Sequence, residues 1–117
     1  MAQNGTATGY SNVMWTGVST ITLARAMLRA IETDLSGIYH LVNNDVISKH
    51  DLLVLFNDII RKNKITISAD DSVVSRKTLK NNRTDFDFTV PSYKEMVMEI
   101  NDWIKNHDSL YVHYREV

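Results

Sequence analysis

The chain has 117 residues, of which 44% are hydrophobic and 23% are charged, and its formal net charge is −1. These values are ordinary for one globular domain with a modest core, and the small net charge creates no overall field that would attract nucleic acid or a membrane surface. Cysteine is absent, which excludes disulfides, thiolate metal sites and cysteine nucleophiles.

The hydrophobic residues nowhere form a run of the roughly 20 residues that a membrane span needs. The N-terminal stretch MAQNGTATGYSNVMW is polar and has no signal-peptide hydrophobic region. We therefore expect a cytoplasmic protein that binds neither nucleic acid nor a membrane.

The first third of the chain predicts an irregular segment, a short strand and a helix. Residues 1–12 show no periodic pattern and are expected to be irregular, and residues 12–15 are expected to form a short strand. Residues 19–34 have the apolar spacing of an amphipathic helix, with Ser19 or Thr20 as its N-cap. The apolar stripe of this helix consists of Ile21, Ala24, Met27, Leu28 and Ile31.

The middle of the chain predicts two more strands around a second helix. The β-favouring residues 37–42, GIYHLV, indicate a strand covered on both faces. Ser48 is placed to cap a helix over residues 48–63, with Asp51 in the position of a capping-box acid. Residues 64–70 alternate apolar and polar side chains, which indicates another strand.

The C-terminal part predicts a third helix, over residues 92–107. Ser92 and Glu95 have the spacing of a capping box and follow Pro91. The side chains expected on its buried face are Met96, Val97, Ile100, Trp103 and Ile104.

The order of elements predicts an α/β chain in the form of a small α+β lobe, with about three helices and two to three short strands. We divide it into an irregular segment (1–12), a lobe (13–107) and a tail (108–117). So few strands do not make an independent sheet of normal size. We therefore expect either a fragment of a larger protein or a lobe that packs against another domain.

Motifs for cofactors, metals and catalysis are absent from the sequence. The four glycines do not give a dinucleotide-binding or P-loop spacing, and no two histidines are four residues apart as on a metal-binding helix. No tyrosine has a lysine four residues later. We therefore assign no catalytic residue and no metal ligand.

One stretch stands out by its charge, the segment SVVSRKTLKNNRTDF at residues 72–86, which we call the basic loop. It contains Arg76, Lys77, Lys80 and Arg83, and no acid before Asp85. Its composition fits either an anion-binding loop or a solvated connection with several cations.

The ordered segments resemble a known family. The residues WTGVSTITLARAMLRAIETDLSGIYHLVNNDVISKHDLLVLF, followed by SVVSRKTLKNNRTDFDFTVPSYKEMVMEI, are similar to the C-terminal portion of extended short-chain dehydrogenases/reductases. The particular likeness is to the dTDP-4-dehydrorhamnose reductase-like sugar-nucleotide reductases of the NAD-dependent epimerase family. It covers about residues 9–107.

The resemblance implies the fold of the substrate-binding part of a Rossmann-type reductase without its dinucleotide-binding half. That half would carry NAD(P) and the Tyr-x-x-x-Lys pair, so we expect this chain to bind no cofactor and to catalyse nothing alone. The implied partners are a nucleotide-sugar of the dTDP-sugar type and the missing Rossmann half. The residues implied at the nucleotide-sugar are Arg76, Lys77, Asn82 and Arg83, with Trp15 and Thr16 as weaker candidates.

A different class of function stays open beside this one. The chain could be a small non-enzymatic docking domain derived from the same family, acting through exposed apolar surface. A lobe without its partner domain exposes apolar side chains, and we expect it either to self-associate or to be marginally stable.

Overall fold

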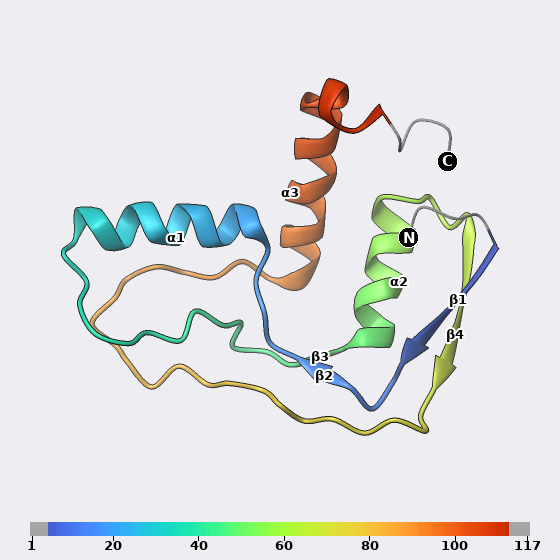
Figure 1. Ribbon diagram of the computed structural model, residues 1–117, viewed down its shortest axis with the longest axis horizontal. Helices are drawn as coiled ribbons and strands as arrows, with labels where there is room; N and C mark the ends of the chain where they lie inside the picture. The colour runs from blue at the N-terminus through green and yellow to red at the C-terminus, as the bar shows by residue number, and fades with distance from the viewer. Residues whose placement is uncertain (1–4, 113–117) are drawn as a thin grey trace.

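The structure is a computed structural model that describes residues 5–112. It is a small α+β domain whose three helices and short strands follow one another as shown in Figure 1. The elements are β1 (Gly5–Tyr10), β2 (Met14–Trp15), α1 (Thr20–Glu32), β3 (Ile47–Ser48), α2 (Lys49–Ile59), β4 (Ile65–Asp70), α3 (Tyr93–Asn106) and the short 3₁₀ helix η1 (Asp108–Leu110).

The strands form two separate pairs. β1 and β4 are parallel and pair from Gly5 with Ile65 to Tyr10 with Asp70. β2 and β3 are antiparallel and pair through two residues each. α2 contacts both β1 and β4, and α3 contacts α2, so these elements form one body from which α1 extends as an arm (Figure 1).

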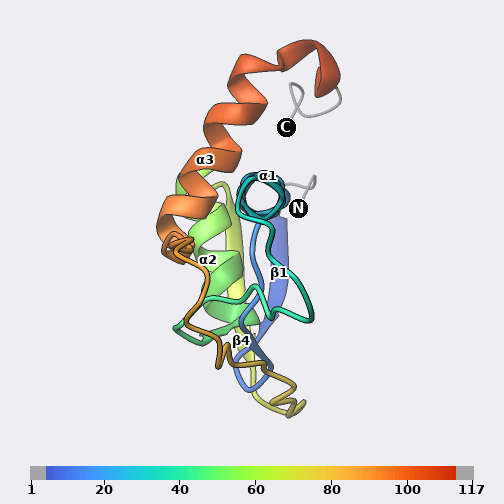
Figure 2. The same ribbon diagram turned by 90° about the vertical axis from the view of Figure 1, so that its left-hand side faces the viewer.

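The molecule is flat, as the edge-on view in Figure 2 shows, with extents of 46 × 39 × 16 Å. Its radius of gyration is 16.2 Å, whereas a compact domain of this length has about 13.4 Å. The hydrophobic residues that are buried are few: Ala26, Ile65, Phe86, Tyr93, Met96 and Val97. The chain therefore encloses only a small core.

The prediction of an irregular N-terminal segment is wrong for Gly5–Tyr10, which forms β1. The strand is held by hydrogen bonds to β4, a segment 60 positions away, and no local pattern signals such a pairing. Gly9 allows the close approach of α2, because a Cβ at this position would lie 2.6 Å from the Cα of His50. Residues 1–4 of the predicted segment lie outside the described range.

The prediction of a strand at residues 37–42 is also wrong, since this segment forms a bend at Gly37 followed by irregular backbone. Its C-terminal end is anchored by Asn43, whose backbone N donates to the carbonyl of Thr16 at 2.9 Å and whose Nδ2 donates to the carbonyl of Pro91 at 2.9 Å. Ile38 is 82% exposed. The composition favours a strand, but within residues 5–112 no strand lies beside this segment to complete a ladder.

The serine N-caps predicted at the starts of the three helices are confirmed. Ser19 and Ser48 cap α1 and α2, because their hydroxyls accept from the backbone N of Thr22 at 3.1 Å and of Asp51 at 3.0 Å. Ser92 caps α3 in a complete capping box, in which the Glu95 carboxylate accepts from the Ser92 backbone N at 2.9 Å. The strands expected near residues 12–15 and 64–70 are present as β2 and β4.

The apolar stripe of α1 is mostly exposed, with Ile21 half-buried. Thr22 and Ala26 are the buried residues of this helix, and the opposite face, with Leu28 and Ile31, is exposed. α1 thus packs on the body through its small residues. Trp103 of α3 is likewise 43% exposed, with its ring stacked on His107 at 3.9 Å between centroids.

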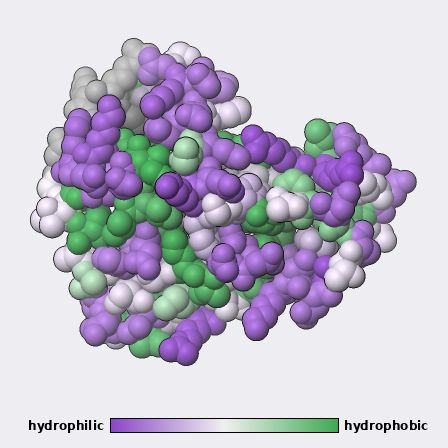
Figure 3. All heavy atoms as spheres, turned by 180° about the vertical axis from the view of Figure 1, so that it is seen from behind, coloured by the Kyte–Doolittle hydropathy of each residue, from purple (hydrophilic) through white to green (hydrophobic). Residues whose placement is uncertain are grey.

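Hydrophobic side chains also gather on the surface. Seen from behind, they form a band over the half of the molecule that contains α2, among largely hydrophilic surroundings (Figure 3). A contiguous patch of this kind differs from single exposed apolar residues, which are normal, and marks a surface suited to contacts with other molecules.

Asn57 can be used to test the hydrogen-bonded contact between α2 and β4. Its buried side chain accepts from the backbone N of Ile65 at 3.1 Å and donates to the carbonyl of the same residue at 2.5 Å. We expect Asn57→Ala to lower the free energy of unfolding by about 2–4 kcal/mol, because it leaves two buried backbone groups unpaired. Urea unfolding measures the change.

The control is Asn44→Ala, since Asn44 is exposed. This variant should unfold within about 0.5 kcal/mol of the wild type. Equal stabilities of the two variants would contradict the role given to Asn57.

Candidate functional site

The basic loop begins as a continuation of the β1–β4 ladder. After the strands end, the backbone N of Ser11 donates to the carbonyl of Asp70 at 3.0 Å. Further on, Ser75 donates to the carbonyl of Asn12 at 3.0 Å and accepts from the backbone N of Met14 at 2.9 Å. The two segments 5–16 and 65–79 therefore run side by side, and the loop starts beside β2.

Thr16 extends this contact into the loop. Its side chain is buried, and its Oγ1 accepts from the backbone N of Leu79 at 3.3 Å. Trp15 packs beside it, with its ring 5.9 Å from that of Tyr93 and directly over Gly17, where a Cβ would lie 2.2 Å from the indole. Thus the structure brings Thr16 to the basic loop as a buried support, whereas the half-buried ring of the adjacent Trp15 lies against Tyr93.

The exposed candidates lie on the outward part of the loop. Arg76, Lys77 and Asn82 are all exposed, and within residues 5–112 neither Arg76 nor Lys77 forms an ion pair. Their charges are available to an anionic ligand.

Arg83 is arranged differently, because its guanidinium is bound within the protein. Nη1 donates to the carbonyls of Ser36 at 2.7 Å and Ile38 at 3.0 Å. Nε and Nη2 donate to the two carboxylate oxygens of Asp85 at 2.9 and 2.5 Å. Its central carbon also lies 5.7 Å from the ring centroid of Tyr39. Four of its five N–H groups are thus engaged: two hold the loop to the segment after α1, and two bind Asp85 within the loop.

The pairing also fixes the charges of both partners. The hydrogen bond to Asp85 raises the pKa of Arg83, and the same bond lowers the pKa of Asp85. The two residues therefore keep opposite charges, and the positive charge of Arg83 is compensated in place. Asp85 was not among the residues singled out from the sequence, although its spacing of two from Arg83 is the signal that could have indicated it.

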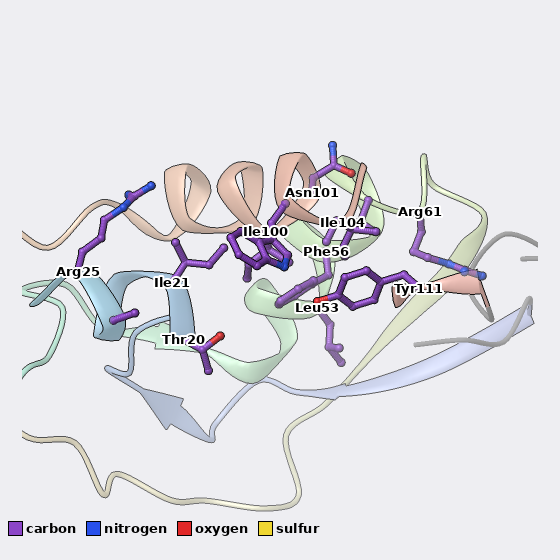
Figure 4. A pocket seen from close by; sticks show the side chains of 13 residues that line it. Thr20, Ile21, Arg25, Leu53, Phe56, Arg61, Ile100, Asn101, Ile104 and Tyr111 are labelled. Atoms are coloured by element: carbon purple, nitrogen blue, oxygen red, sulfur yellow. The ribbon is translucent and has the colours of Figure 1, made fainter. Parts of the chain in front are cut away.

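A second candidate surface is a groove of about 990 Å³ between the three helices, which no motif in the sequence indicated. Apolar side chains from all three helices point into it, and Arg25 and Arg61 lie toward its ends (Figure 4). Arg25 also pairs with Glu99 at 2.9 Å. The lining residues are Thr20, Ile21, Ala24, Arg25, Leu53, Phe56, Ile60, Arg61, Ile100, Asn101, Trp103, Ile104 and Tyr111.

The described part of the chain holds no group of three or more histidine, aspartate or glutamate side chains that could bind a metal ion. None of its helices combines the length and the apolar character needed to cross a membrane. No protein-family model, no curated protein and no solved structure matches the chain.

The role of Arg83 can be tested by a substitution that keeps the charge. We expect Arg83→Lys to lower the protection of backbone amides in the basic loop and in residues 36–39, because an ammonium cannot reproduce the planar fork. Amide hydrogen exchange measures this. Arg76→Lys makes the same change at an exposed position and should leave protection unaltered; identical patterns in both variants would refute the assignment.

Tyr93 gives a prediction for alkaline pH. Its hydroxyl donates to the backbone carbonyls of Asp45 and Trp15, and burial raises its pKa from 10.0 to about 12. Below pH 10 the folded and unfolded chains both keep this proton. Above pH 10 the unfolded chain loses it first, so the stabilising contribution should disappear as pH rises from 10 to 12.

The measurement is the free energy of unfolding at a series of pH values, with Tyr93→Phe as the reference. The difference between the two proteins should shrink across this interval. A difference that stays constant up to pH 12 would show that the hydroxyl is not held as described.

Proposed function

We propose that this chain is the substrate-binding part of a nucleotide-sugar reductase of the dTDP-4-dehydrorhamnose reductase-like kind, and that it does not catalyse a reaction alone. The resemblance of the ordered sequence segments supports this. The observation that carries it is that Trp15 and Thr16 lie beside the basic loop, joined by the hydrogen bond from Leu79 to Thr16. The resemblance implied that both segments approach the same ligand.

The ligand contacts in this proposal are made by Arg76 and Lys77. Both are exposed cations at the start of the loop, and a diphosphate is well matched by charge-assisted hydrogen bonds from such groups. Asn82, also exposed, supplies an amide that can donate to a sugar or phosphate oxygen.

Three of the predicted site residues position the loop in this proposal and do not contact the ligand: Arg83, Trp15 and Thr16. Arg83 would have to give up Asp85 to bind a diphosphate, so its contribution is to hold the far end of the loop. Trp15 and Thr16 support the near end. Arg76 and Lys77 lie between Ser75 and Leu79, the two points at which the near end of the loop is bonded to residues 12–16.

Cofactor binding and proton transfer belong, in this proposal, to residues outside this chain. NAD(P) and the proton-transferring pair would be supplied by a Rossmann half of the parent protein, packed against this lobe. The parallel β1–β4 pair supports such an origin, because parallel strands normally belong to larger sheets covered on both faces. A cytoplasmic location stays a prediction.

The second candidate function is that of a docking domain without a ligand. The exposed apolar face of α1 and the hydrophobic band on the back of the molecule favour it. This function needs no contribution from Arg76 or Lys77, and the experiment below separates the two.

The test is a titration of the isolated chain with a dTDP-sugar, followed by amide NMR. We expect shifts in the basic loop at millimolar ligand, and an affinity about 10-fold weaker in the double variant Arg76→Ala/Lys77→Ala, because charge-assisted bonds are lost. Lys105→Ala, which removes an exposed cation at the end of α3, is the matched control.

Titration with NADPH in place of the nucleotide-sugar should leave the spectrum unchanged. An unresponsive loop at millimolar dTDP-sugar, or equal weakening in the Lys105→Ala control, would refute the assigned site and leave the docking function as the better account.

A further inference from the structure

The apolar face of α1 is unusual for a short helix on the surface of a small domain. Its side chains recur at helical spacing, and Met27, Leu28 and Ile31 are 57%, 59% and 73% exposed. Ile21 and Ala24 lie on the same side of the helix, one to three turns earlier. Met27, Leu28 and Ile31 thus form an exposed apolar ridge, which Ala24 and the half-buried Ile21 continue toward the start of the helix.

The ridge is continuous with the groove between the helices. Ile21 and Ala24 line the groove at the root of α1 (Figure 4), whereas Leu28 and Ile31 lie beyond it on the protruding arm. The same face therefore presents a hollow at its N-terminal end and a ridge at its C-terminal end. A surface that combines the two can be complementary to a second copy of itself.

The exposed area of the chain is large enough for such a contact. Its accessible surface is 8139 Å², whereas a compact monomer of 13.4 kDa exposes about 6,500 Å². The surplus is about 1,600 Å² per chain. Two copies that covered this surplus would bury about 3,200 Å² in total, within the range of obligate homodimers.

We propose that two copies of this chain form a two-fold symmetric dimer in which α1 pairs antiparallel with α1 of the second copy. In this register Ile21 faces Ile31 of the other copy, and Ala24 faces its Leu28. In each pair the two residue numbers average 26. A single two-fold axis that passes beside residue 26 of both copies therefore relates both pairs. Each arm then extends over the groove of the other copy.

The charges at the ends of α1 fit this arrangement. The first turn of the helix contains no acid, so its positive dipole end has no counter-charge from its own turn. In the antiparallel pair, Glu32 of one copy comes opposite Thr20 of the other and supplies that charge.

The dimer does not depend on the nucleotide-sugar proposal, and either can fail without the other. The first test is sedimentation equilibrium of the chain from low micromolar to several hundred micromolar concentration. We expect a monomer–dimer equilibrium, and Leu28→Glu should weaken it about 100-fold, because the substitution removes an apolar anchor twice per dimer.

The matched control is Met98→Glu, which adds the same charge at an exposed methionine of α3 outside the groove lining. It should dimerise like the wild type. Circular dichroism of both variants shows whether they fold, and because the two sites are solvent-exposed we expect unchanged helix content.

The second test fixes the register and uses the absence of native cysteines. Chains with Ala24→Cys and chains with Leu28→Cys are oxidised with copper phenanthroline, separately and as an equal mixture. The mixture should give the disulfide-linked dimer at least several times faster than either chain alone, because residue 24 faces residue 28.

A chain that remains monomeric at several hundred micromolar overturns the proposal. So does a dimer that is weakened by Met98→Glu and not by Leu28→Glu. If either single variant alone forms the disulfide-linked dimer faster than the mixture does, the proposed register is wrong.

Discussion

The parallel pairing of β1 with β4 is the constraint on which the rest of the structure depends. It joins residues 5–10 to residues 65–70, and hydrogen bonds between the following residues carry the contact on to Ser75. α2 connects the two strands in space and packs on both of them, and the Asn57 side chain links its last turn to the first residue of β4. The positions of β2, Trp15 and the basic loop all follow from this one alignment.

The basic loop is bonded to the rest of the chain at several points, and exposed cations lie between them. At its start the loop is held by the ladder and by Thr16, and at its end Arg83 binds Asp85 and the carbonyls of Ser36 and Ile38. An arginine that satisfies so many acceptors contributes more to the shape of the loop than to its free charge. The charges that remain for a ligand are those of Arg76, Lys77 and the neighbouring Lys80, all of them exposed.

The flat shape has a related cause. Each sheet of this chain has only two strands, which is too few to form a layer that the three helices could pack around. The apolar side of α1 and the groove beside it therefore remain open. The helix itself is well formed, since Ser19 caps it and its sequence favours it, and it is attached through Thr22 and Ala26. Most of its hydrophobic face therefore lies outside this chain's core.

The sequence by itself determined what depends on neighbours a few positions apart. The three helices, their serine caps, the capping box of α3 and the strand β4 could all be predicted, because periodicity and capping act within one or two turns. The tertiary structure alone decided that Gly5–Tyr10 is a strand and that residues 37–42 are not, since a strand exists only where a distant partner completes its hydrogen bonds. It likewise decided that the α1 stripe faces solvent and that Arg83 faces inward, because burial and ion pairing depend on which segments meet in space.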